Sequence, residues 1–188
     1  MSTLEIIGVI LSILGVVFTA QKKMIAWYIN ILASLVYGYI FYEANLYADA
    51  ELQVFFIGSA IYGIFQWSKN QKNWQATNTQ FKYLAIGFIL TLISGSLLGY
   101  FHQQFTQNVS FPYFDGILTA ASIWTTYLAA HQKRENWIIW MVIDALYVLM
   151  YIYKDLYLTA GLYGLFVVLA WRGLIKWKVK SGKLKVES

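Results

Sequence analysis

A carboxylate lies among aromatic side chains in an otherwise apolar part of the chain around residue 144. Residues spaced by three and four positions share one face of a helix, and on this face they are Trp137, Trp140, Asp144, Tyr147 and Tyr151. A carboxylate beside indole and phenol rings attracts a flat organic cation, because each cation–π contact contributes about 0.5 to 2 kcal/mol. The spacing therefore indicates binding of a small aromatic ligand that is positive or neutral.

Three further apolar segments, which begin near residues 25, 48 and 158, present polar or aromatic side chains at the same helical spacing. Together with the face around Asp144, these four segments bring polar groups towards a common axis. The candidate binding residues are Trp137, Trp140, Asp144, Tyr147, Gln53, Asn30, Tyr37, Phe56 and Tyr163.

Asp144 has two explanations. It lies about seven residues into its apolar segment, where a carboxylate costs roughly 2.5 to 3.5 kcal/mol on insertion scales. Either it faces a bound ligand, or it is a structural carboxylate that is bonded to a Tyr or Ser of a neighbouring segment or shares a proton. The sequence leaves both explanations open. An anionic ligand is disfavoured, because no Lys or Arg lies deep in any apolar segment.

The composition defines the elements that must position these residues. Of the 188 residues, 59% are hydrophobic and 12% are charged, whereas about a quarter are charged in a soluble domain. A helix needs roughly 20 apolar residues to cross a bilayer. Seven apolar runs have about this length, and they cover residues 4–20, 25–42, 48–67, 83–101, 114–130, 137–153 and 158–177. We therefore predict an all-α polytopic membrane protein with seven transmembrane helices. No room remains for a soluble catalytic domain, and a phosphate-binding loop of the Walker type is absent from the sequence.

Basic residues predict the orientation of these segments. Thirteen of the 14 lysines and arginines follow, or end, the first, third, fifth and seventh segments, and only Lys154 lies on the opposite side. Because basic residues collect on the cytoplasmic side, the N-terminus is predicted outside the cell and the C-terminus inside it. The basic tail, residues 178–188, is interpreted as a cytoplasmic anchor and not as a nucleic-acid site. Trp67, Trp74, Trp171 and Trp177 are predicted to form an aromatic belt at the membrane interface.

The chain contains an internal repeat with an offset of 110 residues. Trp27 falls on Trp137 and Trp67 falls on Trp177 without a gap. An offset of four segments restores the direction through the membrane, so the two copies are predicted to be parallel. The resulting plan of three plus one plus three helices has repeat one at 4–67, a linking helix at 82–101 and repeat two at 114–177. Parallel repeats are a recurrent plan of transporters, which bind their substrate at the repeat interface.

Several stretches form a more specific pattern. They are Leu46-Tyr47-Ala48-Asp49, Gln53-Val54-Phe55-Phe56, Tyr62-Gly63, Gln66-Trp67, Asn136-Trp137-Ile138-Ile139-Trp140 and Leu156-Tyr157-Leu158-Thr159-Ala160. This pattern, over about residues 27–177, resembles the PnuC family of bacterial vitamin transporters. The resemblance implies a SWEET-like fold, nicotinamide riboside as cargo, and no cofactor. It also implies facilitated diffusion across the bacterial inner membrane, made one-way by phosphorylation of the vitamin inside the cell.

Two departures from the family pattern bear on the cargo. Ile64 stands where a second tryptophan is expected, and Asn30 and Ser34 stand in a segment without the proline and glycine of riboside carriers. Sister groups of the family carry thiamine or riboflavin. The thiazolium of thiamine satisfies the same electrostatics as a pyridinium, so the sequence leaves thiamine open as the alternative cargo.

Two other classes of protein fit the sequence less well. A retinal-type light sensor needs a lysine deep in its last segment, and none lies between Leu158 and Trp171. An intramembrane enzyme or metalloprotein needs paired His, Cys or carboxylate groups at depth, whereas His102 and His131 lie on opposite sides of the membrane in the predicted topology. The sequence therefore predicts neither an enzyme nor a metal site. Whether copies of the chain associate is left open.

Overall fold

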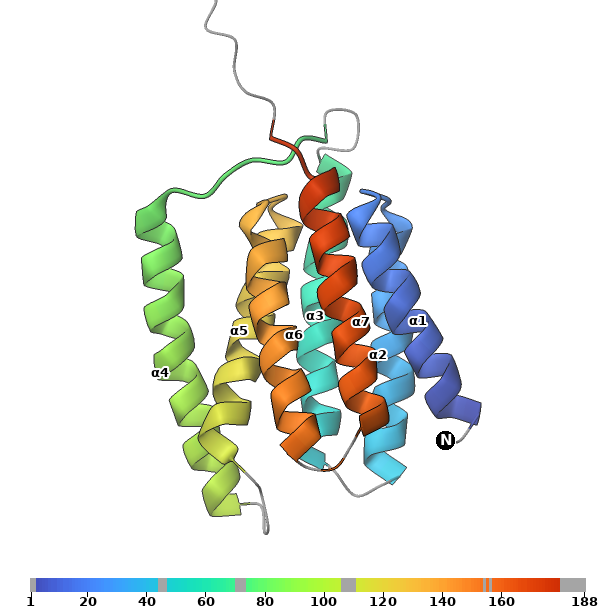
Figure 1. Ribbon diagram of the computed structural model, residues 1–188, viewed down its shortest axis with the longest axis vertical. Helices are drawn as coiled ribbons and strands as arrows, with labels where there is room; N and C mark the ends of the chain where they lie inside the picture. The colour runs from blue at the N-terminus through green and yellow to red at the C-terminus, as the bar shows by residue number, and fades with distance from the viewer. Residues whose placement is uncertain are drawn as a thin grey trace, which may run out of the picture.

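The computed structural model describes residues 3–43, 47–69, 74–105, 111–153, 155 and 157–179. These residues form seven α-helices, as predicted, and a single isolated β-bridge (Figure 1). The helices are α1 (Thr3–Ala20), α2 (Ile25–Glu43), α3 (Tyr47–Lys69), α4 (Phe81–Phe105), α5 (Pro112–Ala130), α6 (Glu135–Tyr153) and α7 (Tyr157–Lys176). The predicted basic tail lies outside the described residues from position 180 onward.

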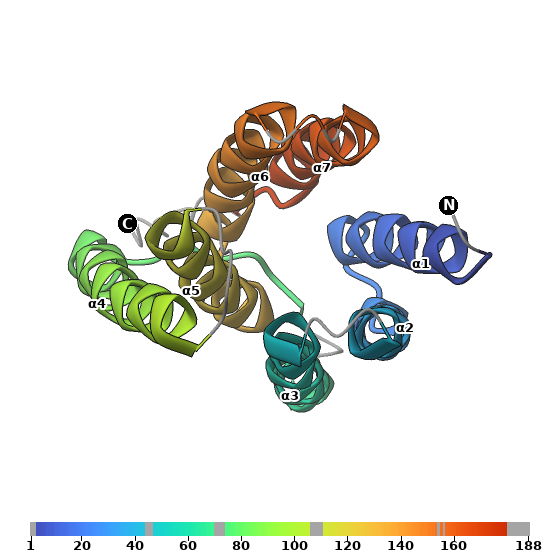
Figure 2. The same cartoon turned by 90° about the horizontal axis from the view of Figure 1, so that it is seen from below.

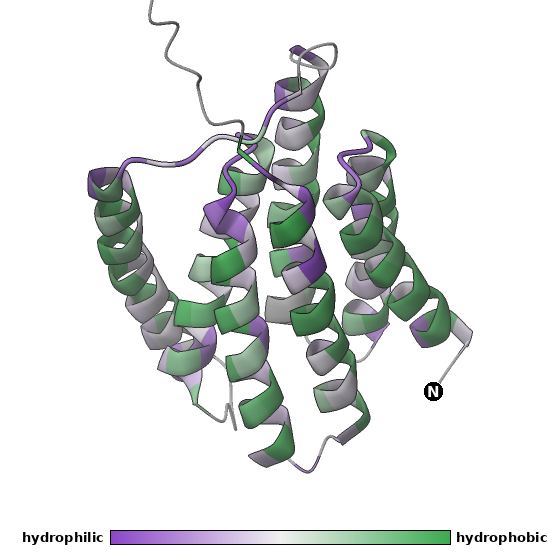
Figure 3. Cartoon of the chain, turned by 45° about the horizontal axis from the view of Figure 1, so that its top comes forward, coloured by the Kyte–Doolittle hydropathy of each residue, from purple (hydrophilic) through white to green (hydrophobic). Residues whose placement is uncertain are grey.

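The surface of the bundle is apolar. Large hydrophobic side chains such as Ile10, Leu90 and Val142 are more than half exposed, and hydrophobic residues dominate the helices in Figure 3. Five of the described helices, α1, α2, α4, α6 and α7, are long and apolar enough to cross a membrane. Helices satisfy their own backbone hydrogen bonds, which lipid cannot do. The fold is therefore that of a polytopic membrane protein.

Six of the described helices close into a ring. α1 contacts α2, α2 contacts α3, α3 contacts α5, α5 contacts α6, α6 contacts α7, and α7 returns to α1. α4 lies outside this ring and packs along α5 (Figure 2). Gly95 and Gly99 of α4 meet the backbone of α5 at Gly116 and its neighbours, because residues without a side chain let two membrane helices approach closely.

The ring consists of two parallel triplets. α1 and α5 run in the same direction, as do α2 and α6, and α3 and α7 (Figure 1). Through the offset of 110 residues, α3 corresponds to α7 and α5 corresponds to α1. The contact between α3 and α5 is therefore equivalent to the contact between α7 and α1. We call these two contacts the seams. The predicted plan of three plus one plus three helices is confirmed, with α4 as the linking helix.

One end of the bundle, at the top of Figure 1, is rich in cations. Here α1, α3, α5 and α7 end, and the turns that follow α1 and α5 carry Lys22, Lys23, Lys133 and Arg134. We call this the basic end. It holds the ends of both seams.

Candidate functional site

Four tryptophans pack together at the basic end, two from each triplet. Trp27, Trp67, Trp137 and Trp177 are at most 2% exposed. The ring centres of Trp27 and Trp67 are 5.4 Å apart with the rings edge to face, and those of Trp137 and Trp177 are 5.3 Å apart in the same arrangement. A contact of 6.1 Å between Trp67 and Trp177 joins the two pairs. We call these four residues the tryptophan cluster.

Glycines opposite the cluster let two of its rings approach a neighbouring helix closely. A Cβ atom on Gly63 would lie 2.5 Å from the ring of Trp27, and Gly173 faces Trp137 in the same way. These two pairs are again related by the offset of 110 residues. Each half of the cluster is therefore built by the same local packing of an indole on a glycine.

The cluster also bonds across both seams. The indole N–H of Trp67 donates to the carbonyl oxygen of Ala129 at 3.1 Å, and that of Trp177 donates to the carbonyl oxygen of Thr19 at 3.2 Å. Positions 19 and 129 also differ by 110. The two triplets are thus held together at the basic end by a symmetric pair of hydrogen bonds.

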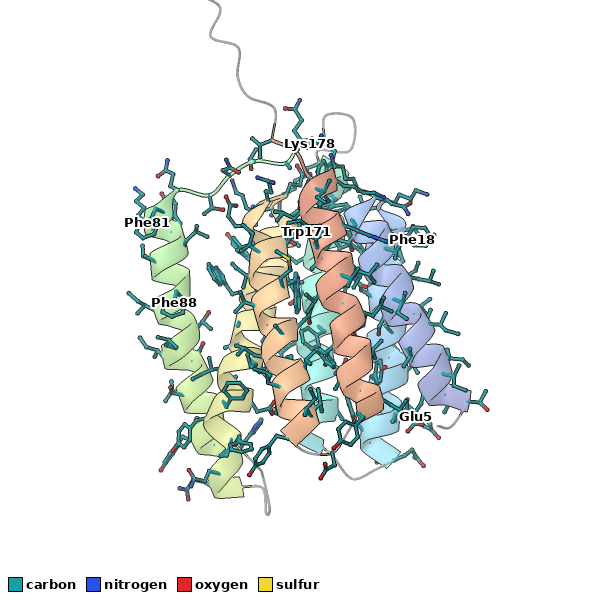
Figure 4. All side chains as sticks on the ribbon, viewed as in Figure 1. Glu5, Phe18, Phe81, Phe88, Trp171 and Lys178 are labelled. Atoms are coloured by element: carbon teal, nitrogen blue, oxygen red, sulfur yellow. The ribbon has the colours of Figure 1, made fainter. Side chains whose placement is uncertain are left out.

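The predicted interfacial belt is wrong for Trp67, Trp74 and Trp177. The first and last are fully buried, and the ring of Trp74 packs 4.7 Å from that of Trp177. Only Trp171, which is 56% exposed, has the exposure expected of a belt residue (Figure 4). The error arose because a tryptophan near a helix end can face lipid or protein with the same local sequence. The repeat offset, which pairs Trp67 with Trp177, was the signal for a shared internal role.

Asp144 lies buried in α6, with 5% of its surface exposed. It makes no hydrogen bond or ion pair with any residue that the structure describes, so the alternative of a carboxylate tied to a neighbouring hydroxyl finds no partner there. It shares one face of α6 with Tyr147, three residues further on, and α7 brings Tyr163 against that tyrosine. The ring centres of these two tyrosines are 4.8 Å apart, and that of Tyr151 is 5.2 Å from Tyr163. The structure therefore brings together three predicted site residues, Asp144, Tyr147 and Tyr163.

The other predicted site residues from α2 and α3 lie in the first triplet. Asn30 contacts Gly15 of α1, and Gln53 lies 3.5 Å from the position of a Cβ on Gly38. Tyr37 stacks on Phe41 at 5.9 Å. Phe56 is half-buried in α3. That these four residues form one binding site with Asp144 stays a prediction.

The two predicted tryptophans of α6 occupy different surroundings. Trp137 belongs to the tryptophan cluster, whereas Trp140 is partly buried and packs against the larger hydrophobic core that contains this cluster. The indole N–H of Trp137 is buried without a hydrogen-bond partner among the described residues, and the same holds for Trp27, its equivalent in the first triplet. The predicted stacking of both α6 tryptophans on a ligand stays untested.

A polar chain across the α3–α5 seam was not expected from the sequence. The side-chain amide of Gln66 donates to the Tyr62 hydroxyl oxygen at 2.7 Å, and this hydroxyl lies 2.8 Å from Nε2 of His131. Because the amide N–H can only donate, the hydroxyl proton of Tyr62 is free to go to His131. Burial and the nearby Lys133 lower the pKa of His131, which favours the neutral ring that accepts this proton.

A ring of two parallel triplets that meet at two equivalent seams, with a buried carboxylate and tyrosines inside the bilayer span, defines a class of protein. It is that of polytopic membrane transporters built from parallel repeats. Groups of His, Asp and Glu that could hold a metal ion do not occur in the described part of the chain.

The chain belongs to the family described as nicotinamide mononucleotide transporter, which it matches over residues 2–179. It is 22% identical to the nicotinamide riboside transporter PnuC of Escherichia coli over 204 residues, which cover 94% of this chain and 85% of that protein. It is 24% identical to the protein of the same name from Neisseria mucosa over 152 residues, which cover 77% of this chain and 58% of that protein.

A solved structure shows the same fold. The crystal structure of the vitamin B3 transporter PnuC matches with a TM-score of 0.75 at 18% sequence identity, and the match covers 93% of this chain and 80% of the other. The predicted family is confirmed, and the protein is a membrane transporter and not an enzyme.

Proposed function

We propose that this chain carries nicotinamide riboside across the bacterial inner membrane. The observation that carries the proposal is the buried Asp144 beside Tyr147 and Tyr163, in a chain whose relatives are named nicotinamide riboside transporters. The pyridinium of the riboside is a flat cation. The carboxylate would balance its charge, and the phenol rings would line its faces at about 0.5 to 2 kcal/mol per contact.

The distribution of cations favours the riboside over its phosphorylated form. In the described part of the chain, the lysines and arginines lie near helix ends or in loops, and Arg172 near the end of α7 is the one placed farthest into a helix. A phosphate group inside the bundle would therefore meet no counter-charge, and an uncompensated anion is costly there. We infer that the ring of six helices admits nicotinamide riboside and excludes its phosphorylated form.

The basic end is proposed to face the cytoplasm, with the N-terminus outside, because positively charged loops are retained on the inner side. Transport is proposed to be facilitated diffusion, made one-way when the cell phosphorylates the vitamin. In this scheme the protein supplies only a selective path, with no coupled energy source.

Uptake into proteoliposomes tests the cargo. We expect purified protein to move labelled nicotinamide riboside down its gradient, and an excess of unlabelled riboside to compete. Nicotinamide mononucleotide, thiamine and riboflavin serve as parallel competitors. Competition by thiamine, with none by the riboside, would transfer the proposal to thiamine, which Ile64 and Asn30 left open in the sequence.

The same assay tests the site and the mechanism. Trp140→Ala and Gln53→Ala should weaken uptake, whereas Trp171→Ala, at an exposed position on α7, should not. Uptake by both site variants at the unmodified rate and affinity would remove these residues from the site. An imposed pH gradient should leave the rate unchanged; acceleration by inward protons would replace facilitated diffusion by proton coupling.

A further inference from the structure

A cavity of about 330 Å³ lies at the basic end, beside the turn that joins α1 to α2. Its lining comes from this turn and from two tryptophans, and consists of Lys22, Lys23, Met24, Ile25, Trp67 and Trp74. The ammonium of Lys22 lies 4.7 Å from the ring centre of Trp74. The ammonium of Lys23 lies 5.2 Å from that of Phe18, which is labelled near this end in Figure 4. Two cations thus border a cavity whose lining contains no acidic residue.

The equivalent turn of the second triplet shows what such a turn can bind. Lys22 and Gln132 correspond through the repeat, and both have a positive φ, of 63° and 59°. In the second turn, the backbone N–H of Arg134 donates to the carbonyl oxygen of Thr77 at 3.0 Å. The ammonium of Lys133 donates to the hydroxyl oxygen of the same threonine, also at 3.0 Å. Oxygen atoms of the segment between α3 and α4 therefore fill the second turn.

The first turn presents the same donors without an acceptor among the residues that the structure describes. Neither the N–H of Met24 nor the ammonium of Lys23, which correspond to the donors of the second turn, makes a hydrogen bond with any described residue. An acidic residue is also missing, since Ile25 stands where the second turn has Glu135, which bonds Thr79. Burial lowers the pKa of Lys22, as expected for a cation without a counter-charge. The first turn is therefore complementary to an anion that bears oxygen atoms.

The surroundings favour a lipid over a soluble anion. Ile25, in the cavity lining, is 50% exposed, and the neighbouring surface of α1 carries exposed Ile10 and Leu14. These side chains belong to the apolar surface that acyl chains cover. We propose that the cavity binds the phosphate group of an anionic phospholipid, with Lys22 and Lys23 as counter-charges and the Met24 N–H as hydrogen-bond donor. The acyl chains then lie against the outer surface of α1 and α2.

Lipid retention by the full chain tests the proposal. Native mass spectrometry of the detergent-solubilised protein, titrated with phosphatidylglycerol and separately with phosphatidylcholine, should show tighter retention of phosphatidylglycerol. The double variant Lys22→Gln, Lys23→Gln should weaken that retention about tenfold or more. Glutamine already occupies the position of Lys22 in the second repeat with the same positive φ, so the backbone of the turn should tolerate it. The double variant Lys22→Arg, Lys23→Arg should retain the lipid.

A charge-matched control separates a site from general attraction. The double variant Lys69→Gln, Lys82→Gln removes two exposed cations from the same end of the bundle, outside the cavity lining, and should keep phosphatidylglycerol binding. Equal loss in both Gln variants would overturn the proposal, as would equal retention of the two lipids by the unmodified protein. Displacement of phosphatidylglycerol by inorganic phosphate or glycerol 3-phosphate would also overturn it, in favour of a soluble phosphate ligand.

Discussion

Trp67 donates its indole N–H to the carbonyl oxygen of Ala129 at 3.1 Å, which ties the end of α3 to the end of α5. The repeat generates a second copy of this bond between Trp177 and Thr19 on the opposite side of the ring. Each seam is therefore closed at the basic end by one of two equivalent hydrogen bonds. Neither seam can open there unless its own bond breaks. The pair of bonds makes this end of the ring a single closed unit in the present conformation.

Removal of either indole N–H should weaken this closure. Trp67→Phe and Trp177→Phe each keep an aromatic ring but lose the donor and leave unfilled space at a fully buried position, so each should lower the free energy of unfolding by about 1 kcal/mol or more. Thermal unfolding in detergent measures the change. Trp171→Phe, at an exposed position, is the matched control and should melt like the unmodified protein. Unchanged melting of both cluster variants would mean that the bonds do not stabilise the fold.

The glycines under the cluster should not tolerate a methyl group. In Gly63→Ala and Gly173→Ala, the new Cβ collides with the rings of Trp27 and Trp137, and overpacking of this kind costs about 1 to 3 kcal/mol. Gly164→Ala in α7 adds the same methyl group where no atom lies within 4 Å, so its stability should be unchanged or slightly higher. The melting temperatures of the three variants measure these differences in stability. Similar values for all three would contradict the packing described for the tryptophans.

Asp144→Asn should separate transport from stability. The variant keeps the size of a buried side chain that has no hydrogen-bond partner among the described residues, so the thermal stability should not fall. Uptake of a cationic vitamin should fall about tenfold or more, which corresponds to the loss of about 1.4 kcal/mol of binding. Glu43→Gln, at an exposed carboxylate that ends α2, is the control for both measurements. Full uptake by the Asn variant would remove Asp144 from the substrate path.

Stability should depend on pH through His131. Because burial and Lys133 lower its pKa in the folded state, His131 of the unfolded chain binds a proton at a higher pH, about 6.5. Stability should therefore fall as the pH drops through about 6.5 and level off below the folded-state pKa. Protonation also removes the acceptor for the hydroxyl proton of Tyr62, which lies 2.8 Å away on the other side of the α3–α5 seam.

Melting temperatures measured from neutral to mildly acidic pH check this dependence. His131→Gln should flatten the profile in that interval, because it removes the group whose pKa is lowered there. His102→Gln, in the last turn of α4, should keep the profile of the unmodified protein. A profile that is the same with and without His131 would assign the pH dependence to another group.

Much of the architecture could be predicted from the sequence. The cost of placing residues in lipid is summed over a stretch of about 20 residues, so the seven helices follow from local composition. The gathering of basic residues at one end of the bundle also follows from their spacing along the chain, and the parallel triplets follow from an offset that aligns Trp27 with Trp137. Asp144, Tyr147 and Tyr163 could also be grouped, because helical spacing places the first two on one face of α6 and gives α7 a face with the same kinds of side chain.

What only the tertiary structure decided is which apolar face of each helix meets protein and which meets lipid. Hydropathy cannot separate the two, because lipid tails are as apolar as a packed interior. For that reason the sequence predicts Trp67 and Trp177 at the interface although they are buried, and it gives no sign of the contact of Tyr62 with His131 across the seam. The cavity beside Lys22 has the same origin. Thr77, in the segment between α3 and α4, bonds the turn of the second triplet, whereas Trp74 of the same segment offers the first turn a ring and no acceptor oxygen. No local sequence pattern shows which of two equivalent turns another part of the chain will bond.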